Sequence, residues 1–265
     1  MRNLPRSPFI LILGALLAAV AVIFLALPLI AIVARALADQ AWQGTPAGEV
    51  AQALALSLWT TVATVALAIL FGTPLAYALA RGRFRFRRSL STLVELPIVL
   101  PPAVAGLALL MAFGRRGLLG PVLEQADIAL PFTTAAVILA QTFVAAPLYV
   151  RAAQVGFEGV PRDLEDAARV DGASEQRVLW HVTLPLTARS LAAGLTLCWA
   201  RAMGEFGATI LFAGSLPGRT QTMPLLIYGA LERDLDAAVW TGVVLIVLAL
   251  AALLVSRRLQ TLNAS

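Results

Sequence analysis

The chain has 265 residues, of which 60% are hydrophobic and 13% charged, with a formal net charge of +5 at pH 7. Its mean hydropathy of +0.85 is too high for a soluble globular domain. The sequence contains no lysine, which excludes a P-loop ATPase site. Cys198 and His181 are the only residues of their types, so an internal disulfide, a cysteine metal site and a Ser–His–carboxylate triad find no support.

Several apolar runs are long enough to cross a membrane, which takes about 20 helical residues. Five of these runs carry no charge, at residues 9–34, 50–80, 96–114, 128–150 and 237–256. A sixth segment, residues 190–212, is interrupted only by Arg201 and Glu205. The sequence therefore predicts an all-α, polytopic membrane protein with about six transmembrane helices.

Prolines predict irregular backbone in two of these spans. Pro74 lies in the last third of the second span and favours a kink there. The third span is interrupted by Pro97, Pro101 and Pro102. Broken backbone at membrane depth is tolerated where it is packed in protein or lines a water-filled cavity. We therefore expect the third span to line a pathway or to be a kinked packing helix.

One polar segment, residues 159–185, separates the fourth span from the fifth, and we call it the polar island. Pro161 suits the first turn of a helix. Carboxylates that complement the positive end of the helix dipole follow at Asp163, Glu165 and Asp166. A small apolar face is formed by Leu164, Ala167 and Ala168. The pattern predicts a short helix that can approach a partner closely.

The rest of the polar island predicts a turn and a second short helix. Gly172 can take the left-handed conformation past the end of the first helix. Ser174 can cap a second helix that runs toward His181. Pro185 then predicts a break before the next span.

Two residues of opposite charge stand inside the fifth span. Arg201 and Glu205 share a helical face and are within ion-pairing reach. An isolated charge near the midplane costs on the order of 3 kcal/mol, so such residues normally face the bundle interior or an aqueous cavity. Gly204 and Gly207 beside them allow close approach of another helix. These four residues are expected either to join helices or to line a translocation pathway near its gate.

The arginines fall mainly in alternate loops. One set precedes the first span, follows the second, surrounds the polar island and follows the last span: Arg2, Arg6, Arg81, Arg83, Arg85, Arg87, Arg88, Arg151, Arg162, Arg169, Arg177, Arg189, Arg257 and Arg258. The intervening loops hold only Arg35, Arg115, Arg116, Arg219 and Arg233. The positive-inside rule therefore predicts that both termini and the island are cytoplasmic.

The polar island resembles the EAA loop of ABC importer permeases. Asp166-Ala167-Ala168 is followed after three residues by Gly172, and after nine more by Val182-Thr183-Leu184-Pro185. Aspartate stands where this loop usually has glutamate, and valine where it usually has isoleucine. Residues 53–258 look like the core of a binding-protein-dependent ABC importer permease, behind an N-terminal membrane helix and outer loop at residues 1–52. The resemblance implies the MetI-like permease fold.

In that family two permease copies form the pathway, and each EAA loop docks in a cleft of a cytoplasmic ATPase subunit. The resemblance implies a coupling helix within residues 163–172, with contacts made by Asp163, Leu164, Asp166, Ala167, Ala168 and Gly172. It implies three kinds of partner: a second copy of the chain, two cytoplasmic ATP-binding subunits and an extracytoplasmic binding protein. Membrane lipid is expected as a further partner, because the run of arginines and aromatics at residues 82–88 suits anionic headgroups. Nucleic acid is not expected as a partner. The ATPase subunits would bind ATP and Mg, so no cofactor, metal or enzymatic activity is expected in this chain.

Residues 96–102, 113–120, 200–210 and 217–228 resemble the molybdate permeases of that family, with the sulfate permeases next. The resemblance implies import of molybdate, and of the chemically similar tungstate, across the cell membrane from a molybdate-binding protein. A sulfate or thiosulfate importer is the alternative. An ion-coupled secondary transporter is the alternative of another class, but proton coupling usually needs several intramembrane ionisable groups. Only Glu205, and Glu95 near a span end, qualify.

Overall fold

The computed structural model describes the backbone of residues 8–262, and every regular element in that range is a helix. The long helices are α1 (Pro8–Ala38), α2 (Ala47–Leu67), α7 (Thr134–Glu158), α10 (Leu184–Met203) and α13 (Leu235–Leu262). The shorter α-helices are α3 (Thr73–Arg81), α4 (Arg87–Val99), α5 (Pro102–Phe113), α6 (Gly120–Gln125), α8 (Arg162–Val170), α9 (Glu175–Val178), α11 (Gly207–Phe212) and α12 (Met223–Leu231). The predicted all-α class is confirmed. Arg2 and Arg6 lie outside the described residues, as does the side chain of Arg257.

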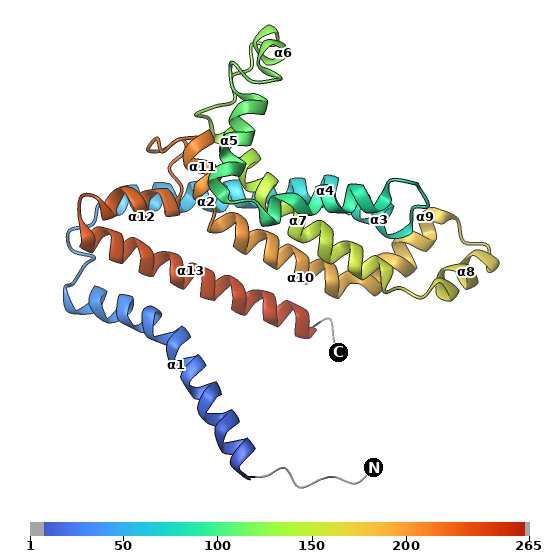
Figure 1. Ribbon diagram of the computed structural model, residues 1–265, viewed down its shortest axis with the longest axis horizontal. Helices are drawn as coiled ribbons and strands as arrows, with labels where there is room; N and C mark the ends of the chain where they lie inside the picture. The colour runs from blue at the N-terminus through green and yellow to red at the C-terminus, as the bar shows by residue number, and fades with distance from the viewer. Residues whose placement is uncertain (1–7, 263–265) are drawn as a thin grey trace. The chain divides into compact units, whose positions relative to one another are not determined.

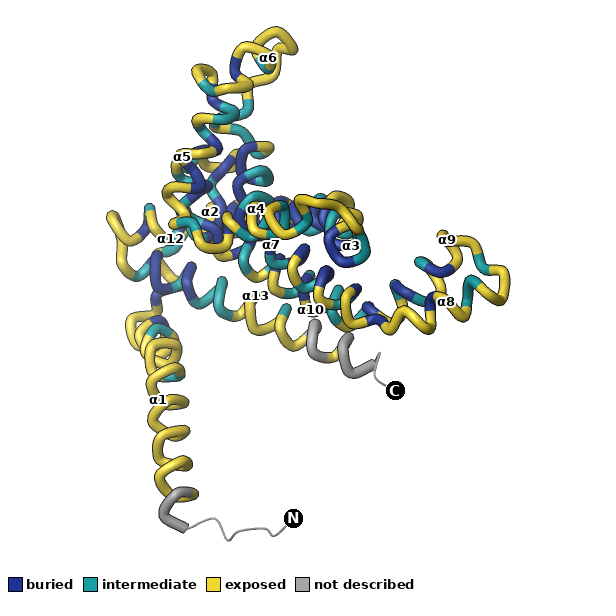
Figure 2. The backbone as a smooth tube through the Cα atoms, turned by 45° about the vertical axis from the view of Figure 1, so that its right-hand side comes forward, coloured by how far each residue is buried: buried dark blue, intermediate teal, exposed yellow. Residues whose placement is uncertain are grey.

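The chain forms two compact units, of which the first comprises residues 1–46 and 227–246. Ala36, Ala41 and Val239 form its small core. The rings of Trp42 and Trp240 meet edge to face, with centroids 5.9 Å apart. The most apolar stretch of α1 has a mean hydropathy of 3.1 and contains no buried residue, so α1 is drawn almost wholly as exposed in Figure 2. Such an apolar surface suits contact with lipid.

The second unit comprises residues 47–226 and 247–265, and α7 is its central helix. Helices α2, α3, α4 and α10 all pack against α7, and Figure 1 shows them running alongside it. Tyr149 and Phe157 of α7 are buried in one core with Leu79 of α3. A second core joins Val137 of α7 to α5 and α11 through Phe212. Because these six helices cover α7, half of its most apolar stretch is buried.

Two π-helical segments accommodate prolines inside long helices. The π-helix η1 (Ala68–Gly72) joins α2 to α3 just before Pro74, and η2 (Leu179–Thr183) joins α9 to α10 just before Pro185. A proline has no N–H and clashes with the carbonyl one helical turn back, and the wider π turn relieves both problems. The break expected at Pro185 was therefore wrong, because α9, η2 and α10 follow one another without interruption.

The third predicted span is broken where its prolines lie. Helices α4 and α5 meet at Leu100 and Pro101 with a bend of 116°. Gly106 of α5 lies against α11, and a Cβ atom built there would be 2.8 Å from the carbonyl oxygen of Ala208. The small residue therefore allows α11 to reach the backbone of α5. The broken backbone predicted for this span is confirmed.

By length and apolarity, four helices within the described range could each cross a membrane, and the bent pair of α4 and α5 could form a fifth. The fourth of the predicted spans begins later than expected, at Thr134, and extends to Glu158. Residues 190–212 do not form one helix, because α10 ends at Met203 and α11 begins at Gly207. Gly204, directly after α10, favours the end of that helix because glycine is a poor helix former. The Glu205 carboxylate then helps α11 to start by accepting a hydrogen bond from the N–H of Ala208 at 2.7 Å.

Candidate functional site

The polar island folds as a helical hairpin at one end of the second unit, beyond α3 and the end of α7 (Figure 1). Helix α8 occupies residues Arg162–Val170, and Gly172 follows it with a φ of +88°. The Ser174 hydroxyl accepts the N–H of Arg177 and caps α9. The short helix, the left-handed glycine and the second helix are confirmed. We call α8, the turn and α9 the island hairpin.

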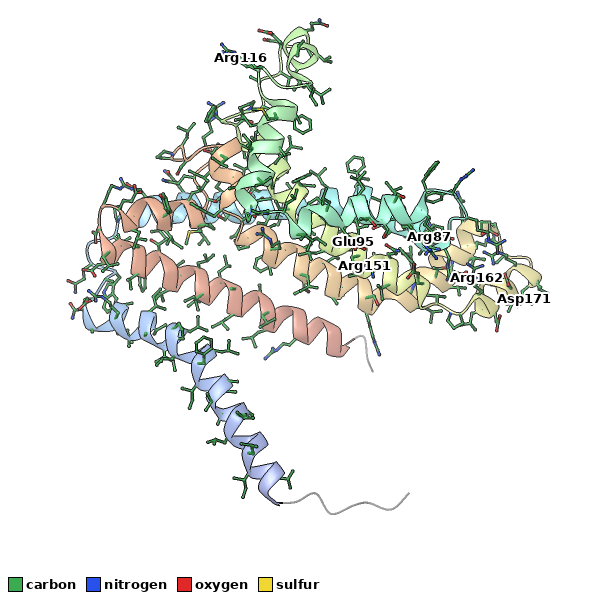
Figure 3. All side chains as sticks on the ribbon, viewed as in Figure 1. Arg87, Glu95, Arg116, Arg151, Arg162 and Asp171 are labelled. Carbon is green, nitrogen blue, oxygen red and sulfur yellow. The ribbon has the colours of Figure 1, made fainter. Side chains whose placement is uncertain are left out.

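The apolar face of α8 is exposed. Leu164 and Val170 expose 48% and 88% of their surface, and Ala167 is exposed as well. Ala168 is half-buried, while Asp163 and Asp166 are exposed beside it. An exposed apolar stripe with small residues and flanking carboxylates can receive the surface of another protein. In Figure 3, Arg162 and Asp171 mark the two ends of this helix.

Arg169 ties the two arms of the island hairpin together. Its guanidinium contacts Asp166 on its own helix and Glu175 on α9, with both N–O distances equal to 2.7 Å. The hydrogen bond from Arg169 lowers the pKa of Glu175, and Glu175 in turn raises the pKa of Arg169. This clamp lies in water, so its strength is limited by solvent screening.

The clamp predicts that the island hairpin loosens only in acid. The pKa of Glu175 is lower in the folded hairpin than in the unfolded chain, so its contribution to stability is complete above the ordinary value of 4.5. The contribution is lost as the pH falls through the lowered pKa. We expect hydrogen exchange of residues 162–178 to be unchanged between pH 8 and pH 6 once corrected for intrinsic rates. Protection should fall below the ordinary pKa, and Arg169→Gln should abolish that acid-dependent step. A step near neutral pH would contradict the assignment.

Glu165 was expected only to complement the dipole of α8, but it points inward and is 3% exposed. Its Oε1 accepts hydrogen bonds from Arg81 Nη2 at 2.9 Å and from Thr183 Oγ1 at 2.8 Å. Arg81 Nη2 also donates to the Val160 carbonyl at 3.1 Å. In the sequence, Glu165 is only a carboxylate one turn from the small apolar face. Its burial could not be predicted from that pattern, because its partners Arg81 and Thr183 lie 84 and 18 residues away along the chain.

Arg201 and Glu205 form the expected ion pair, with Arg201 Nη1 2.7 Å from Glu205 Oε2. The two side chains differ in exposure, which is 31% for Arg201 and 1% for Glu205. Glu205 follows the end of α10, and its other oxygen caps α11 through Ala208. The pair therefore stabilises the break between the two helices, and Arg201 presents its free edge to the surface of the unit.

The two glycines beside this pair have different surroundings. A Cβ atom at Gly207 would be 2.6 Å from Cβ of Pro102, so α11 packs on α5 at this position without room for a side chain. A Cβ atom at Gly204 would meet only the Ala200 carbonyl oxygen, at 3.7 Å. Close approach of a helix is confirmed at Gly207 and is absent at Gly204.

A ladder of polar side chains joins α4 to α7, and sequence reasoning did not identify it. Arg87 pairs with Glu158, Ser91 with Gln154, and Glu95 with Arg151, at the successive turns of the two helices. Glu95 Oε1 lies 3.4 Å from Arg151 Nη1, and these side chains are 39% and 51% exposed. Figure 3 shows Glu95 and Arg151 facing each other. The polar residues recur at helical spacing on each of the two helices in the sequence. The sequence does not show that the residues of α4 pair with those of α7.

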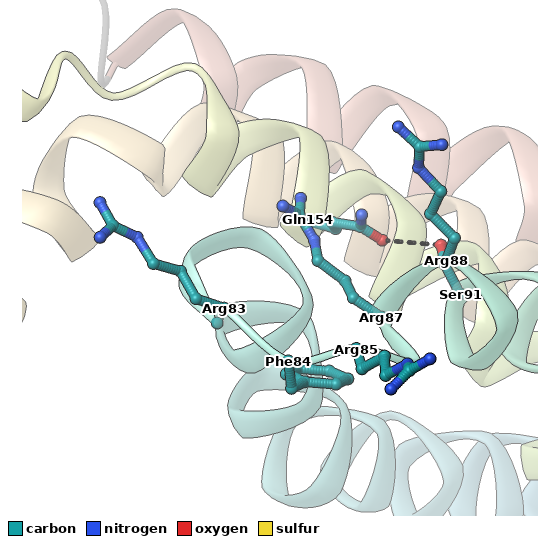
Figure 4. A pocket seen from close by; sticks show the side chains of 8 residues that line it. Arg83, Phe84, Arg85, Arg87, Arg88, Ser91 and Gln154 are labelled. Carbon is teal, nitrogen blue, oxygen red and sulfur yellow. Dashed lines mark hydrogen bonds between the residues drawn. The ribbon is translucent and has the colours of Figure 1, made fainter.

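The loop between α3 and α4 surrounds an open hollow of about 780 Å³. Figure 4 shows guanidinium groups of Arg83, Arg85 and Arg88 around it, beside the bond between Ser91 and Gln154. In the part of the chain that the structure describes, these three arginines have no ion-pair partner. The hollow is strongly basic and suits an anionic group.

Metal-binding groups are not found among the described residues, where no three His, Cys, Asp or Glu side chains could hold an ion together. What remains is a set of helices, several of them long and apolar enough to cross a membrane, with an exposed apolar hairpin and a broken, charged helix. These features define a helical membrane protein.

The comparison with known families agrees with this class. Residues 68–265 match the family described as binding-protein-dependent transport system inner membrane component. The chain belongs to this family, whose members are transport subunits in membranes. It is therefore a multi-pass membrane protein.

The chain is similar to the molybdenum transport system permease protein ModB of Mycobacterium tuberculosis. The two are 47% identical over 234 residues, which is 86% of each chain. It is also 38% identical to the sulfate transport system permease protein CysW of Synechococcus elongatus, over 78% of this chain and 74% of that one. A bacterial alginate ABC transporter, solved in complex with alginate pentasaccharide-bound periplasmic protein, shares the fold with a TM-score of 0.69 and 17% identity. That match covers 94% of this chain and 95% of the other.

Proposed function

We propose that this chain is the membrane subunit of an ATP-driven importer of molybdate, and of tungstate through the same pathway. The observation that carries the proposal is the 47% identity, across most of both chains, to a permease named for molybdenum transport. The exposed island hairpin also supports the proposal, because it offers a surface on which a partner protein can act. A chain with no P-loop needs an external energy source, and an exposed apolar helix of small residues gives that source a surface to hold.

In this proposal, α8 is the coupling helix and docks in a cytoplasmic ATP-binding subunit. The contacts come from Asp163, Leu164, Asp166, Ala167, Ala168 and Gly172. Leu164 and Ala167 are exposed and can enter a groove, and Gly172 turns the chain without a side chain in the way. Closure of two ATP-binding subunits would move the hairpins of two copies together and open the pathway outward.

The proposed pathway passes the break between α10 and α11, with Arg201, Glu205, Gly204 and Gly207 at or near the gate. The half-exposed Arg201 can meet a tetrahedral dianion, while Glu205 neutralises part of its charge. An arginine partly neutralised in this way attracts an anion without trapping it. The polar ladder between α4 and α7 supports a water-facing surface on these two helices, because half-exposed charges on such helices normally face water rather than lipid.

The arginine distribution supports cytoplasmic termini and a cytoplasmic island. The partners in this proposal are a second copy of the chain, two ATP-binding subunits that hold ATP and Mg, and an extracytoplasmic molybdate-binding protein. Anionic lipid is a further partner, since the basic hollow beside α4 is flanked by the exposed Phe84 and Phe86. The N-terminal helix and outer loop, residues 1–52, precede a permease core at residues 53–258.

A sulfate or thiosulfate importer is the second candidate, supported by the 38% identity to a sulfate permease. Both ligands are tetrahedral dianions, so selectivity would reside largely in the separate binding protein. An ion-coupled secondary transporter is less well supported, because the intramembrane Glu205 is held in an ion pair and a helix cap.

The proposal is tested by ATP-dependent uptake in proteoliposomes that contain this chain, its ATP-binding subunit and its loaded binding protein. Uptake of molybdate should require all three proteins and ATP, and tungstate should compete with it. Sulfate uptake in preference to molybdate would establish the alternative importer. Uptake by this chain without a second polypeptide would contradict the importer class.

A further inference from the structure

We propose that Arg81, Glu165 and Thr183 form a buried latch that passes the movement of the coupling helix directly into two membrane helices. The inference rests on the proposed function, since it describes how force would leave α8. Two stretches of chain already connect the island hairpin to the bundle, one at each of its ends. The latch adds a third connection between the island hairpin and the bundle, made by side chains that are distant from one another in sequence.

The geometry of Glu165 carries the proposal. The residue lies on α8, opposite the exposed stripe, and is 3% exposed. A single carboxylate oxygen, Oε1, accepts both the Arg81 guanidinium at 2.9 Å and the Thr183 hydroxyl at 2.8 Å. A buried carboxylate with two directional donors resists rotation and sliding more than an apolar contact does.

Arg81 extends the latch to the base of the hairpin. The same nitrogen that holds Glu165 also donates to the carbonyl of Val160 at 3.1 Å, two residues before α8 begins. Arg81 is the last residue of α3, and its side chain is 13% exposed. One end of α8 and its first turn are therefore fixed to the end of α3.

The two helices that receive the latch share an unusual feature. Arg81 ends the helix that follows the π-segment η1, and Thr183 is the last residue of the π-segment η2. π-helical turns are rare and often occur at functional sites, where they allow a helix to bend. Movement of Glu165 would thus act on two helices, each next to a turn that can change its geometry.

The test separates a coupling role from a structural one by using paired apolar replacements. Arg81→Met or Glu165→Leu alone leaves a buried charge without its partner, which destabilises a fold strongly. The double variant Arg81→Met with Glu165→Leu removes both charges and should restore thermal stability close to wild type. It should still import about tenfold fewer ions per ATP hydrolysed, because the directional bonds are gone.

Two further variants bracket this result. Glu165→Gln keeps an acceptor oxygen for Arg81 and Thr183 and should retain most of the transport per ATP. Arg35→Gln breaks an exposed ion pair with Asp39 near the end of α1, with side chains 55% and 40% exposed, and should leave transport per ATP unchanged. Each is measured in the full complex with loaded binding protein.

A double variant that regains both stability and the wild-type number of ions per ATP would overturn the latch. So would a Glu165→Gln variant that behaves like Glu165→Leu in a stable complex, since its acceptor would then not matter. If the wild-type complex itself shows no ATP-dependent oxyanion uptake, the proposed function fails, and that result is distinct from either outcome.

Discussion

Replacing Ala168 with tryptophan is expected to separate ATP hydrolysis from transport. Ala168 is half-buried on the proposed coupling helix, beside the exposed Ala167 and Leu164. A bulky ring at this position prevents the close approach that a small-residue face allows. Coupling free energies between sites correspond to about 5–150-fold effects, and we expect transport to fall by at least the lower value. The assembled complex should retain basal ATPase activity but lose its stimulation by loaded binding protein.

A matched pair of glycines tests the same surface without adding bulk. Gly172 has a φ of +88°, and a Cβ atom there would meet no other atom within 4 Å, so Gly172→Ala perturbs only the backbone. Left-handed backbone costs a non-glycine residue about 1–2 kcal/mol, which should tilt the island hairpin. Gly159, at the other end of the island, has a φ of −75° and room for a Cβ atom at ordinary contact distances. Gly159→Ala should therefore transport like wild type.

Uptake and ATP hydrolysis are measured for Ala168→Trp, Gly172→Ala and Gly159→Ala in the same proteoliposomes. Normal stimulation of ATPase activity by loaded binding protein in Ala168→Trp and Gly172→Ala would contradict the coupling role of α8. If Gly159→Ala lost as much activity as Gly172→Ala, the island would be sensitive to any substitution. The loss in Gly172→Ala could then not be assigned to its left-handed backbone.

Removal of Arg201 is expected to damage the protein more than removal of Glu205, because the two partners differ in burial. Arg201→Met leaves the 1% exposed Glu205 carboxylate without its cation. Loss of one member of a buried pair typically costs about 3–5 kcal/mol. Glu205→Ala leaves a half-exposed arginine, which water can solvate, and removes the side-chain acceptor at the start of α11, for which about 0.5–2 kcal/mol is typical.

The measurement is thermal unfolding in detergent followed by molybdate uptake. Glu205→Gln, which still accepts the N–H of Ala208, should keep more stability than Glu205→Ala. Glu124→Ala is the control, since Glu124 is an exposed residue at the end of α6. Near-wild-type uptake by Glu205→Ala, Arg201→Met and Glu124→Ala alike would remove the pathway assignment for the charge pair.

Local sequence patterns predicted the island hairpin closely. Pro161, Gly172 and Ser174 act through their own backbone or their nearest neighbours, and all three stand where helix α8 begins, the turn forms and α9 begins. The same local reasoning failed at Pro185. Whether a proline breaks a helix depends on how the preceding turn adjusts, and here η2 adjusts by widening.

The span at residues 190–212 shows a second kind of limit. Its apolarity predicted one continuous helix, and Arg201 and Glu205 were correctly paired. The helix nevertheless ends at Met203, because the Glu205 carboxylate turns to cap α11 and α11 packs on α5 at Gly207. Composition alone does not distinguish a helix that continues from one that stops and restarts.

The sequence by itself determined the helical class, the number and extent of the apolar runs, the arginine asymmetry and the outline of the island hairpin. Each of these depends on composition or on residues within a few positions of one another. Only the tertiary structure decided that Glu165 is bonded to Arg81 and Thr183, and that Glu95 faces Arg151. These partners are distant along the chain, and they meet because α7 gathers α3, α4 and α10 around it, which no local periodicity encodes.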